Sequence, residues 1–236
     1  MAAIEPVWDD PRVVEGMRAQ VARRAADLAG GEEHAGWKIG FGAPAAKANL
    51  GTSAALVGYL VKSRRVDDGG TVDISGFAKA ALEPEVAVHL SGDVAPGATR
   101  EETAAAIAGI GPAIEIADIH LPLDDVAAVL AGDIFQRAYV LGPITRAIGE
   151  VDLSASAGRV EADGEVLAST DDLTALVGDA VDLVRHAAGY LGASGLALEA
   201  GSVLITGSVT PLVFPTPGRT YRVDLGPVGS VSIRLV

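Results

Sequence analysis

Three glutamates lie inside two apolar, strand-like segments of this chain, and few folds can accommodate that arrangement. Glu83 and Glu85 stand two residues apart within residues 82–90, so on an extended strand their side chains leave the same face. Glu115 is embedded between two isoleucines in the second segment, residues 112–119. A buried carboxylate without a partner costs several kcal/mol. The fold is therefore expected to bring positive charge to these three side chains.

A divalent cation would supply that charge. The chain contains no Cys, so the ligands would all be oxygens, and such a site favours Mg²⁺ or Mn²⁺ and less readily Ca²⁺. The alternative is that Glu83 and Glu85 lie on the solvated face of an amphipathic strand, as two alternating glutamates do by default. Pro84 between them indicates a strand start or a sheet edge. The metal interpretation depends most on the embedded Glu115.

The remaining pattern contains more strands than helices. Asp10 and Pro11 open a helix that continues at helical spacing until Gly30. A capping box begins at Thr99 and predicts a short helix to about Ile107. A second amphipathic helix is predicted over residues 173–191. Asp163 and Gly164 indicate a hairpin turn, and further strand-like runs cover residues 37–41, 55–61, 71–74, 86–90 and 112–119.

We predict an α+β fold because strands predominate and no regular βαβ alternation is present. The expected architecture is a rolled, mostly antiparallel, barrel-like sheet with flanking helices. The 236 residues suffice for one main domain, and with 49% hydrophobic but only 4% aromatic residues the core must consist largely of aliphatic side chains. Residues 1–35 are interpreted as an N-terminal helical lead-in and residues 36–236 as the catalytic domain.

The net charge of −13 argues against nucleic acid and anionic membranes as partners. No apolar run approaches the ~20 residues that span a bilayer, and the start of the chain lacks a secretory leader pattern. Without Cys nothing indicates an oxidising compartment, so a cytoplasmic location is expected. An anionic substrate would need a local positive centre, either a buried basic side chain or a bound metal.

Several motifs resemble one enzyme family. They are GWKIGF at residues 36–41, LEPEVAVHL at 82–90, GPAIEIAD at 111–118, YVLG at 139–142 and LITGS ending at residue 208. Their order resembles that of the 2-keto-4-pentenoate hydratase and 4-oxalocrotonate decarboxylase branch of the fumarylacetoacetate hydrolase superfamily. The resemblance extends from about residue 12 to the C-terminus and implies the fold of that superfamily.

By this resemblance Glu83, Glu85 and Glu115 occupy the positions of the family's three metal-binding carboxylates. A glutamate at the third position is typical of the hydratases and decarboxylases rather than of the hydrolases. The family's metal, Mg²⁺ or Mn²⁺, chelates a 2-oxo acid and stabilises the enolate that forms from it. The implied partner is therefore a small anionic 2-oxo acid, and the family also implies a homo-oligomer.

Lys38 matches the lysine of the family's K-I-G motif, which implies substrate binding and proton transfer. Its burial within an apolar run is expected to lower its pKa, although a lysine at a strand edge can also extend its amine to the surface. Thr206, Gly207 and Ser208 resemble the family's T-G-S turn, where hydroxyl and N–H groups hold a substrate carboxylate. The alternative for these three residues is an ordinary turn between strands.

Two departures concern proton transfer. Leu56 stands where hydratases commonly have an acidic residue, and residues 132–136 replace the run D-N-A-S. Asp133, Gln136 or Arg137 are candidates for the vacated space.

The leading hypothesis is a metal-dependent hydratase that adds water to a 2-hydroxydienoate, or 2-keto-4-pentenoate type of substrate, and yields a 4-hydroxy-2-oxo acid. Three alternatives stay open at this point. They are decarboxylation of a 2-oxo-enedioate, hydrolytic C–C cleavage of an acylpyruvate, and a non-catalytic homologue that keeps the fold and the metal.

Overall fold

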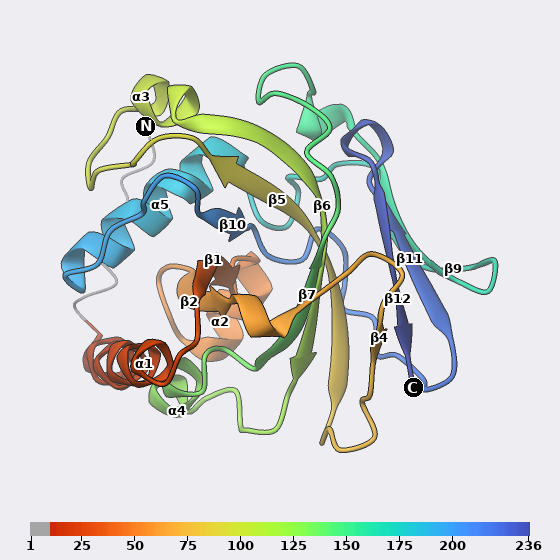
Figure 1. The fold of residues 1–236 in the computed structure, drawn as a ribbon, viewed down its shortest axis with the longest axis horizontal. Helices are drawn as coiled ribbons and strands as arrows, with labels where there is room; N and C mark the ends of the chain where they lie inside the picture. Colours follow the sequence, from red (N-terminus) through yellow and green to blue (C-terminus); the bar gives the residue numbers. More distant parts are fainter. Residues whose placement is uncertain (1–9) are drawn as a thin grey trace.

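The computed structural model describes residues 10–236, whose strands form two sheets (Figure 1). Sheet A runs in the order β2-β1-β10-β5-β6-β7-β3 and sheet B in the order β4-β12-β11-β8-β9. The strands are β1 His34–Gly40, β2 Leu56–Val61, β3 Arg65–Val66, β4 Thr71–Val72, β5 Ala80–Leu90, β6 Ile107–Asp118, β7 Gln136–Leu141, β8 Gly158–Ala162, β9 Glu165–Thr170, β10 Val203–Ile205, β11 Thr220–Asp224 and β12 Ser230–Leu235. The helices are α1 Pro11–Ala29, α2 Pro44–Leu50, α3 Arg100–Ala105, α4 Val126–Ala131 and α5 Ala180–Ala193, with 3-10 turns η2 Lys62–Arg64, η3 Leu153–Ala155 and η4 Gly226–Val228.

Sheet A is rolled into an open barrel because its two edge strands are almost consecutive in the chain. Only η2 separates β2, at one edge, from β3, at the other. Three residues cannot cross the width of a flat sheet of this size, so the edges must approach each other. The Tyr139 hydroxyl on β7 donates a hydrogen bond to the Val61 carbonyl on β2 at 3.2 Å, which ties the two sides together.

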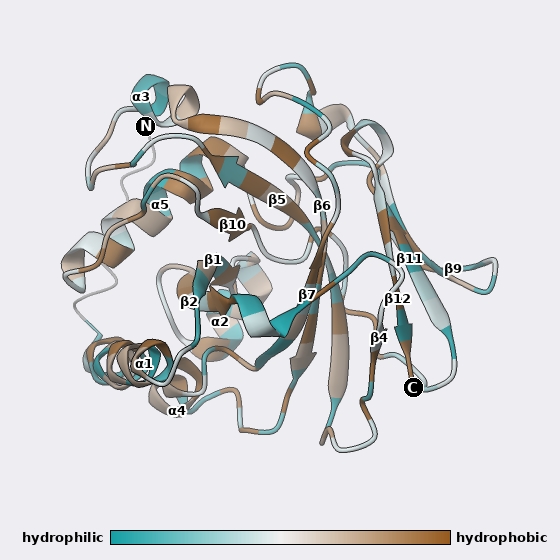
Figure 2. Cartoon of the chain, viewed as in Figure 1, coloured by the Kyte–Doolittle hydropathy of each residue, from teal (hydrophilic) through white to brown (hydrophobic). Residues whose placement is uncertain are grey.

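The roll gives sheet A a tight inner face and a broad outer face. A small apolar cluster fills the inner face and includes Leu60, Ala87, Ala113, Tyr139 and Ile205. The main core lies outside it, between sheet A, the helices and sheet B. Figure 2 shows the apolar residues concentrated on β5, β6 and β10, whereas η2 is hydrophilic. Small side chains on the central strands leave space inside the roll for larger groups.

The helices and sheet B cover the outside of the roll. Helix α1 packs against α4, where Gly16 allows close approach to Ala127 and Leu130. Helix α5 packs against α3 and β2, and β11 and β12 of sheet B contact β6. The predicted α+β architecture, with a rolled and mostly antiparallel sheet, is confirmed. The division of the chain at residue 35 stays a prediction, and residues 1–9 of the predicted lead-in lie outside the described residues.

Features set by local sequence agree with their predictions. Asp10 caps α1 through the Arg12 N–H, and Thr99 closes a capping box with Glu102. Asp163 and Gly164 both have positive φ, at 51° and 84°, as a tight hairpin turn between β8 and β9 requires. Local side-chain to backbone contacts are enough to specify such features.

Two predictions about the elements are wrong. The second amphipathic helix begins at Ala180 rather than at residue 173, because Asp179 accepts the N–H groups of Val181 and Asp182 and so caps the helix there. Pro84 lies in the middle of β5 rather than at its start. It is tolerated because its side of β5 faces the irregular segment after β10, where the Pro84 carbonyl accepts the Val209 N–H.

Within residues 10–236 no helix combines the length and the apolar character needed to cross a membrane.

Gly36, two residues before Lys38 on β1, lies very close to the backbone of β10. Adding a single methyl group at this position is therefore expected to lower the stability of the fold strongly. A Cβ at residue 36 would lie 2.0 Å from the Val203 carbonyl oxygen of β10. Gly36→Ala is therefore expected to lower the free energy of unfolding by about 3 kcal/mol or more. The control, Gly189→Ala in α5, meets nothing within 4 Å and should raise it by up to about 1 kcal/mol. Urea denaturation of both variants checks this, and equal effects would contradict the β1–β10 packing.

Candidate active site

Four charged side chains from three strands of sheet A meet on one face of the roll. Glu83 on β5 stands directly opposite Glu115 on β6, and Glu85 follows two residues along β5 on the same face. Lys38 on β1 pairs with Ile205, which pairs with Ala87 of β5, so its side chain shares that face. The structure therefore brings together the lysine and the three glutamates that the sequence analysis singled out.

The Lys38 ammonium is buried and satisfied by two partners. It donates a hydrogen bond to Glu115 Oε1 and a second, of 3.1 Å, to the carbonyl oxygen of Ile134. The side chain of Lys38 is 3% exposed and that of Glu115 is 0% exposed. The alternative that Lys38 extends its amine to the surface is wrong. Removing one partner of a buried pair of this kind is strongly destabilising, because the other charge is then left uncompensated.

The other carboxylate oxygens are only partly satisfied. Glu85 Oε2 accepts the Gly207 N–H at 2.6 Å. Glu85 Oε1 and Glu115 Oε2 are buried and have no hydrogen-bond partner among the described residues. Buried unpaired oxygens are rare in proteins and usually point to a ligand, an ion or water.

Burial and mutual repulsion disturb the pKa values of these acids. Burial and then the charge of Glu115 raise the pKa of Glu83 to about 7, although the Lys38 ammonium opposes the shift. The same causes, with Glu83 added, raise the pKa of Glu85 well above its ordinary value. One ammonium does not neutralise three neighbouring carboxylates, so the site favours either protons or further positive charge.

The predicted lowering of the Lys38 pKa is wrong. Burial alone would lower it, but the charges of Glu115, Glu83 and Glu85 together outweigh burial and raise the pKa of Lys38 above its usual value. Lys38 is therefore an ammonium at neutral pH, and it acts in this site as a positive charge and a hydrogen-bond donor.

The Thr-Gly-Ser segment follows β10 and borders the same region. Gly207, with φ of 91°, turns its N–H toward Glu85. Ser208 is half-buried, and its hydroxyl donates to the carbonyl oxygen of Thr210 at 2.9 Å. The Thr206 hydroxyl is buried and has no hydrogen-bond partner among the described residues. Gly207 and Ser208 line the adjacent cavity described below, whereas Thr206 does not.

A left-handed turn after α4 supports Lys38 from the other side. Asp133, Ile134 and Phe135 have φ values of 61°, 50° and 66°, a conformation that is unfavourable for β-branched and bulky residues. This turn presents the Ile134 carbonyl to Lys38 and the Asp133 carboxylate to β2. Strain of this kind persists only where the surrounding contacts maintain it.

The Asp133 carboxylate lies against β2, next to the side chain of Lys38. Its Oδ1 accepts the Tyr59 N–H at 2.9 Å, and its Oδ2 pairs with Arg64 at 3.0 Å. A Cβ at Gly58 would lie 2.9 Å both from Asp133 Oδ1 and from Lys38 Cγ. Burial raises the pKa of Asp133 to about 7, despite the Tyr59 N–H and the charges of Lys38 and Arg64.

Asp133 and Gln136, two of the three candidates for the space vacated near Leu56, lie in this region. Arg64 from η2 donates to Gln136 Oε1 at 2.7 Å as well as to Asp133. Arg137 instead pairs with Asp118 at 3.5 Å, away from Lys38. Sequence reasoning missed Arg64 because it lies in the polar run Lys-Ser-Arg-Arg and carries no motif.

A cavity of about 340 Å³ opens next to the charged cluster. Lys38 and Glu83 are the charged side chains that line it within residues 10–236. Its other walls come from α2, from the left-handed turn, and from loops around residues 119–123, 176–177 and 207–212. A concave, largely apolar site with a few convergent polar groups is typical of small-molecule binding.

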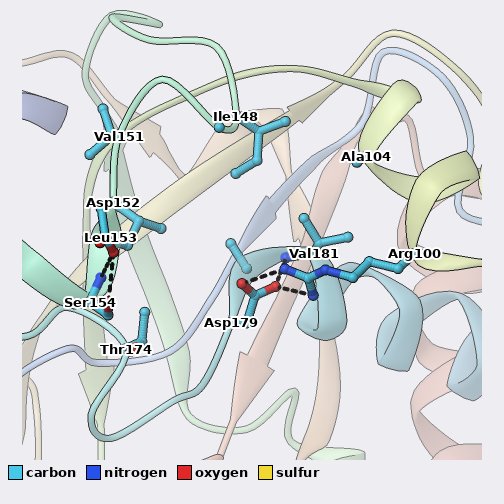
Figure 3. Close-up of a pocket in the computed structure, with 12 residues that line it drawn as sticks. Arg100, Ala104, Ile148, Val151, Asp152, Leu153, Ser154, Thr174, Asp179 and Val181 are labelled. Carbon is cyan, nitrogen blue, oxygen red and sulfur yellow. Dashed lines mark hydrogen bonds and ion pairs between the residues drawn. The ribbon is translucent and has the colours of Figure 1, made fainter. Parts of the chain in front are cut away.

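A second pocket, of about 350 Å³, is lined by a different set of residues (Figure 3). Arg100 lines it, but its guanidinium already forms a two-pronged pair with Asp179 at 2.7 and 2.8 Å. Asp152 there accepts from the N–H and hydroxyl of Ser154. Arg100, Asp179 and Asp152 thus already have partners within the protein. The pocket contains none of the predicted site residues, so the chemistry is assigned to the first cavity.

The donor set of the charged cluster fits a hard divalent cation. Glu85 Oε1 and Glu115 Oε2 are buried without hydrogen-bond partners among the described residues, and burial together with the charge of Glu115 raises the pKa of Glu83. Across residues 10–236, however, no three His, Asp or Glu side chains are arranged so that they could hold an ion together. Glu115 pairs with Lys38 instead, and metal binding would require the carboxylates to turn toward one another.

Known sequences resemble the chain over most of its length. The family model described as "Fumarylacetoacetate (FAA) hydrolase C-terminal" matches residues 42–236. A 4-oxalocrotonate decarboxylase of a Pseudomonas species is 28% identical over 86% of this chain and 78% of the relative. A 2-hydroxyhexa-2,4-dienoate hydratase of Comamonas testosteroni is 29% identical over 87% and 80%. A 2-keto-4-pentenoate hydratase of Burkholderia vietnamiensis is 29% identical over 85% and 78%.

Solved structures of this family also resemble the chain. The 4-oxalocrotonate decarboxylase of Pseudomonas putida G7, complexed with magnesium and adipate, superposes with a TM-score of 0.88. It is 27% identical, and the match covers 95% of this chain and 86% of that one. The same enzyme complexed with calcium and acetate gives a TM-score of 0.87 at 28% identity, with the same coverage of both chains. The fold expected from the motifs is thereby confirmed.

The raised pKa of Glu83 predicts how stability changes with pH. The folded protein binds a proton at Glu83 up to about pH 7, whereas the unfolded chain releases it near pH 4.5. Stability in a chelating buffer should therefore fall as the pH rises through this window. Glu83→Gln should flatten the fall by roughly 1.4 kcal/mol per pH unit.

Urea denaturation between pH 5 and 8 provides the measurement. The control variant, Glu15→Gln, changes an exposed glutamate of α1 and should leave the slope unchanged. A slope that is the same in the wild type and in Glu83→Gln would mean that Glu83 carries no raised pKa.

Proposed function

Since the chain belongs to the fumarylacetoacetate hydrolase family, we propose that it is a divalent-metal-dependent hydratase that adds water to a 2-hydroxydienoate. The observation that carries this proposal is the convergence of Lys38 and three glutamates on one face of sheet A, next to an apolar cavity that Lys38 and Glu83 line. Relatives named as hydratases are about as similar to the chain as those named as decarboxylases. The alternative activity is therefore decarboxylation of a 2-oxo-enedioate.

Glu83, Glu85 and Glu115 are the proposed metal ligands. Mg²⁺ or Mn²⁺ is the proposed ion, in keeping with the all-oxygen donor set and with the magnesium and calcium complexes of the neighbouring structure. When bound, the metal would hold the 2-oxo acid and withdraw electrons from it. One oxygen each of Glu85 and Glu115 has no hydrogen-bond partner within residues 10–236, which supports this assignment.

Lys38 is the proposed catalytic residue. Its buried ammonium offsets the charge of an anionic substrate and carries exchangeable protons at Nζ. The Ile134 carbonyl and the Asp133 turn orient the side chain of Lys38, which lines the cavity. Asp133 and Arg64 do not line the cavity and would act through Lys38.

Gly207 and Ser208 are proposed to bind the substrate carboxylate. The Ser208 hydroxyl already donates to a neighbouring carbonyl and can be redirected by rotation about one bond. The Gly207 N–H is held by Glu85, and it becomes available if Glu85 turns toward a metal. Thr206, whose buried hydroxyl has no partner among residues 10–236, is proposed to support this turn.

The reaction is balanced by one water molecule. Its hydroxyl group adds to carbon 4 of the dienoate and its proton to carbon 3, while the enol proton leaves oxygen and a proton arrives at carbon 5. Lys38 is the group positioned to exchange such protons. A cytoplasmic location and a homo-oligomeric state stay predictions beside this proposal.

The metal assignment predicts a loss of binding in three variants. Glu83→Gln, Glu85→Gln and Glu115→Gln each remove one charged ligand, so each should weaken Mg²⁺ or Mn²⁺ binding at least about tenfold. Titration calorimetry on chelator-treated protein provides the measurement, with Glu15→Gln as the control. Wild-type affinity in all three variants would refute the site.

The assignment of Lys38 predicts a loss of turnover. Lys38→Met keeps the length of the side chain but removes its charge and its protons, so turnover should fall at least about 10²-fold. The assay incubates the enzyme and Mg²⁺ with a panel of 2-hydroxydienoates, 2-oxo-enedioates and acylpyruvates. Mass spectrometry then separates gain of water, loss of carbon dioxide and chain cleavage.

The matched control is Lys62→Met, which removes a lysine whose side chain is 60% exposed. Circular dichroism in Mg²⁺ verifies that both variants are folded, since Glu115 loses its partner in Lys38→Met. Turnover of Lys38→Met within a few-fold of the wild type would make Lys38 a structural residue. Loss of carbon dioxide in place of gain of water would assign the decarboxylase activity.

A further inference from the structure

Backbone strain in this chain is concentrated around the cavity beside Lys38. Within residues 10–236, the residues other than glycine that have a positive φ are Phe41, Asp133, Ile134, Phe135 and Asp163. Asp163 belongs to the hairpin turn, whereas Phe41, Ile134 and Phe135 line the cavity. A left-handed backbone is unfavourable for side chains as large as phenylalanine, and it persists mainly where a functional site requires it.

The two strained phenylalanines come from separate turns and contact each other. Phe41, with φ of 57°, follows the end of β1 and lies three residues after Lys38. Phe135, with φ of 66°, follows Ile134, whose carbonyl oxygen accepts a hydrogen bond from Lys38. The two ring centroids are 6.5 Å apart, with 59° between the ring planes. Both rings are therefore connected by short stretches of backbone to the groups that hold the Lys38 ammonium.

The two rings differ in how accessible they are. Phe135 is 4% exposed, and its carbonyl oxygen accepts the Asp118 N–H at 2.9 Å. A second ring contact holds Phe135 edge-on to His120, with centroids 5.6 Å apart and 82° between the planes. Phe41 is only half-buried. Phe135 is therefore a fixed support, and Phe41 presents accessible ring surface to the cavity that both residues line.

An aromatic ring in this position suits a flat, unsaturated chain. Conjugation holds the carbons of a dienoate in one plane, and aromatic rings attract such π-systems beyond what the buried area alone contributes. A saturated chain of the same length lacks the π-system and loses more rotational freedom on binding. A cavity wall that contains an aromatic ring thus distinguishes the two chains, and an aliphatic wall does so less.

We propose that Phe41, supported by Phe135, is a specificity-determining residue that packs against the conjugated carbons of the substrate and favours them over a saturated chain. The inference rests on the proposed function, which supplies a conjugated substrate bound beside Lys38. It assigns no proton transfer to either ring. It also explains why two bulky side chains are kept in an unfavourable backbone conformation at this cavity.

The test compares two acids of equal length that cannot enter the proposed reaction. Sorbate, which is 2,4-hexadienoate, is conjugated and planar, and hexanoate is its saturated counterpart. Both lack the 2-hydroxyl group, so binding is measured without turnover. In calorimetry with Mg²⁺, the wild type should bind sorbate at least about fivefold more tightly than hexanoate. Equal affinities, or no measurable binding of sorbate, overturn the proposal.

Phe41→Leu and Phe41→Tyr form a matched pair of variants. Leucine keeps an apolar side chain but removes the ring, so the preference for sorbate should fall to within about twofold. Tyrosine keeps the ring and should retain the preference. Phe135→Leu removes the supporting ring and should also lower the preference. A preference in Phe41→Leu equal to that of the wild type overturns the role of Phe41.

The control makes the same exchange at a different phenylalanine. Phe77 is partly buried against the main core and, in the described part of the chain, lies outside the cavity lining. Phe77→Leu should therefore leave the preference for sorbate unchanged. Thermal unfolding in Mg²⁺ verifies that each variant is folded. Loss of the preference in Phe77→Leu as well would mean that it reflects the fold rather than the ring of Phe41, and would overturn the proposal.

Turnover separates this inference from the proposed function. If no dienoate is hydrated, the hydratase proposal fails, while the preference for sorbate still decides the role of Phe41. If a dienoate is hydrated, Phe41→Leu should raise its KM about fivefold, because the ring contacts the substrate before the reaction begins. An unchanged KM in Phe41→Leu overturns the inference and leaves the hydratase proposal standing.

Discussion

The buried ion pair between Lys38 and Glu115 is the interaction on which the rest of the site depends. It joins β1 to β6 across two intervening strands of sheet A. Neither group is tolerated alone in an apolar interior, because each charge would then be desolvated without compensation. The roll of sheet A makes the pairing possible, since it turns one face of these strands inward on a common centre.

The surroundings of Lys38 show how much structure is devoted to holding one ammonium. A strained left-handed turn supplies the Ile134 carbonyl, and the Asp133 carboxylate lies along the lysine stem over Gly58. Arg64 links that carboxylate to Gln136 at the seam where the two edges of the sheet meet. The closure of the roll and the position of Lys38 are therefore maintained by the same contacts.

The mixed lining of the cavity follows from the same architecture. Lys38 and Glu83, its charged lining residues, come from strands of sheet A, and the pairing of β5 with β6 holds Glu115 close enough to add to the rise in the pKa values of Glu83 and Glu85. Loops and α2 contribute much of the apolar lining. Within a family whose relatives include both hydratases and decarboxylases, differences in substrate are then expected to arise in the loops while the charged residues on the strands are retained.

The sequence by itself determined the features that depend on a few neighbouring residues. The capping box at Thr99, the turn at Asp163 and the shared strand face of Glu83 and Glu85 all follow from local geometry, and the embedded Glu115 marked the site. Only the tertiary structure decided that Glu115 meets Lys38, 77 residues away, and that Asp133 rather than Arg137 lies beside it. The direction in which the pKa of Lys38 shifts was likewise decided by the tertiary structure. Burial is visible in a sequence, but the sign of the shift depends on which charges the folded chain brings within a few ångströms.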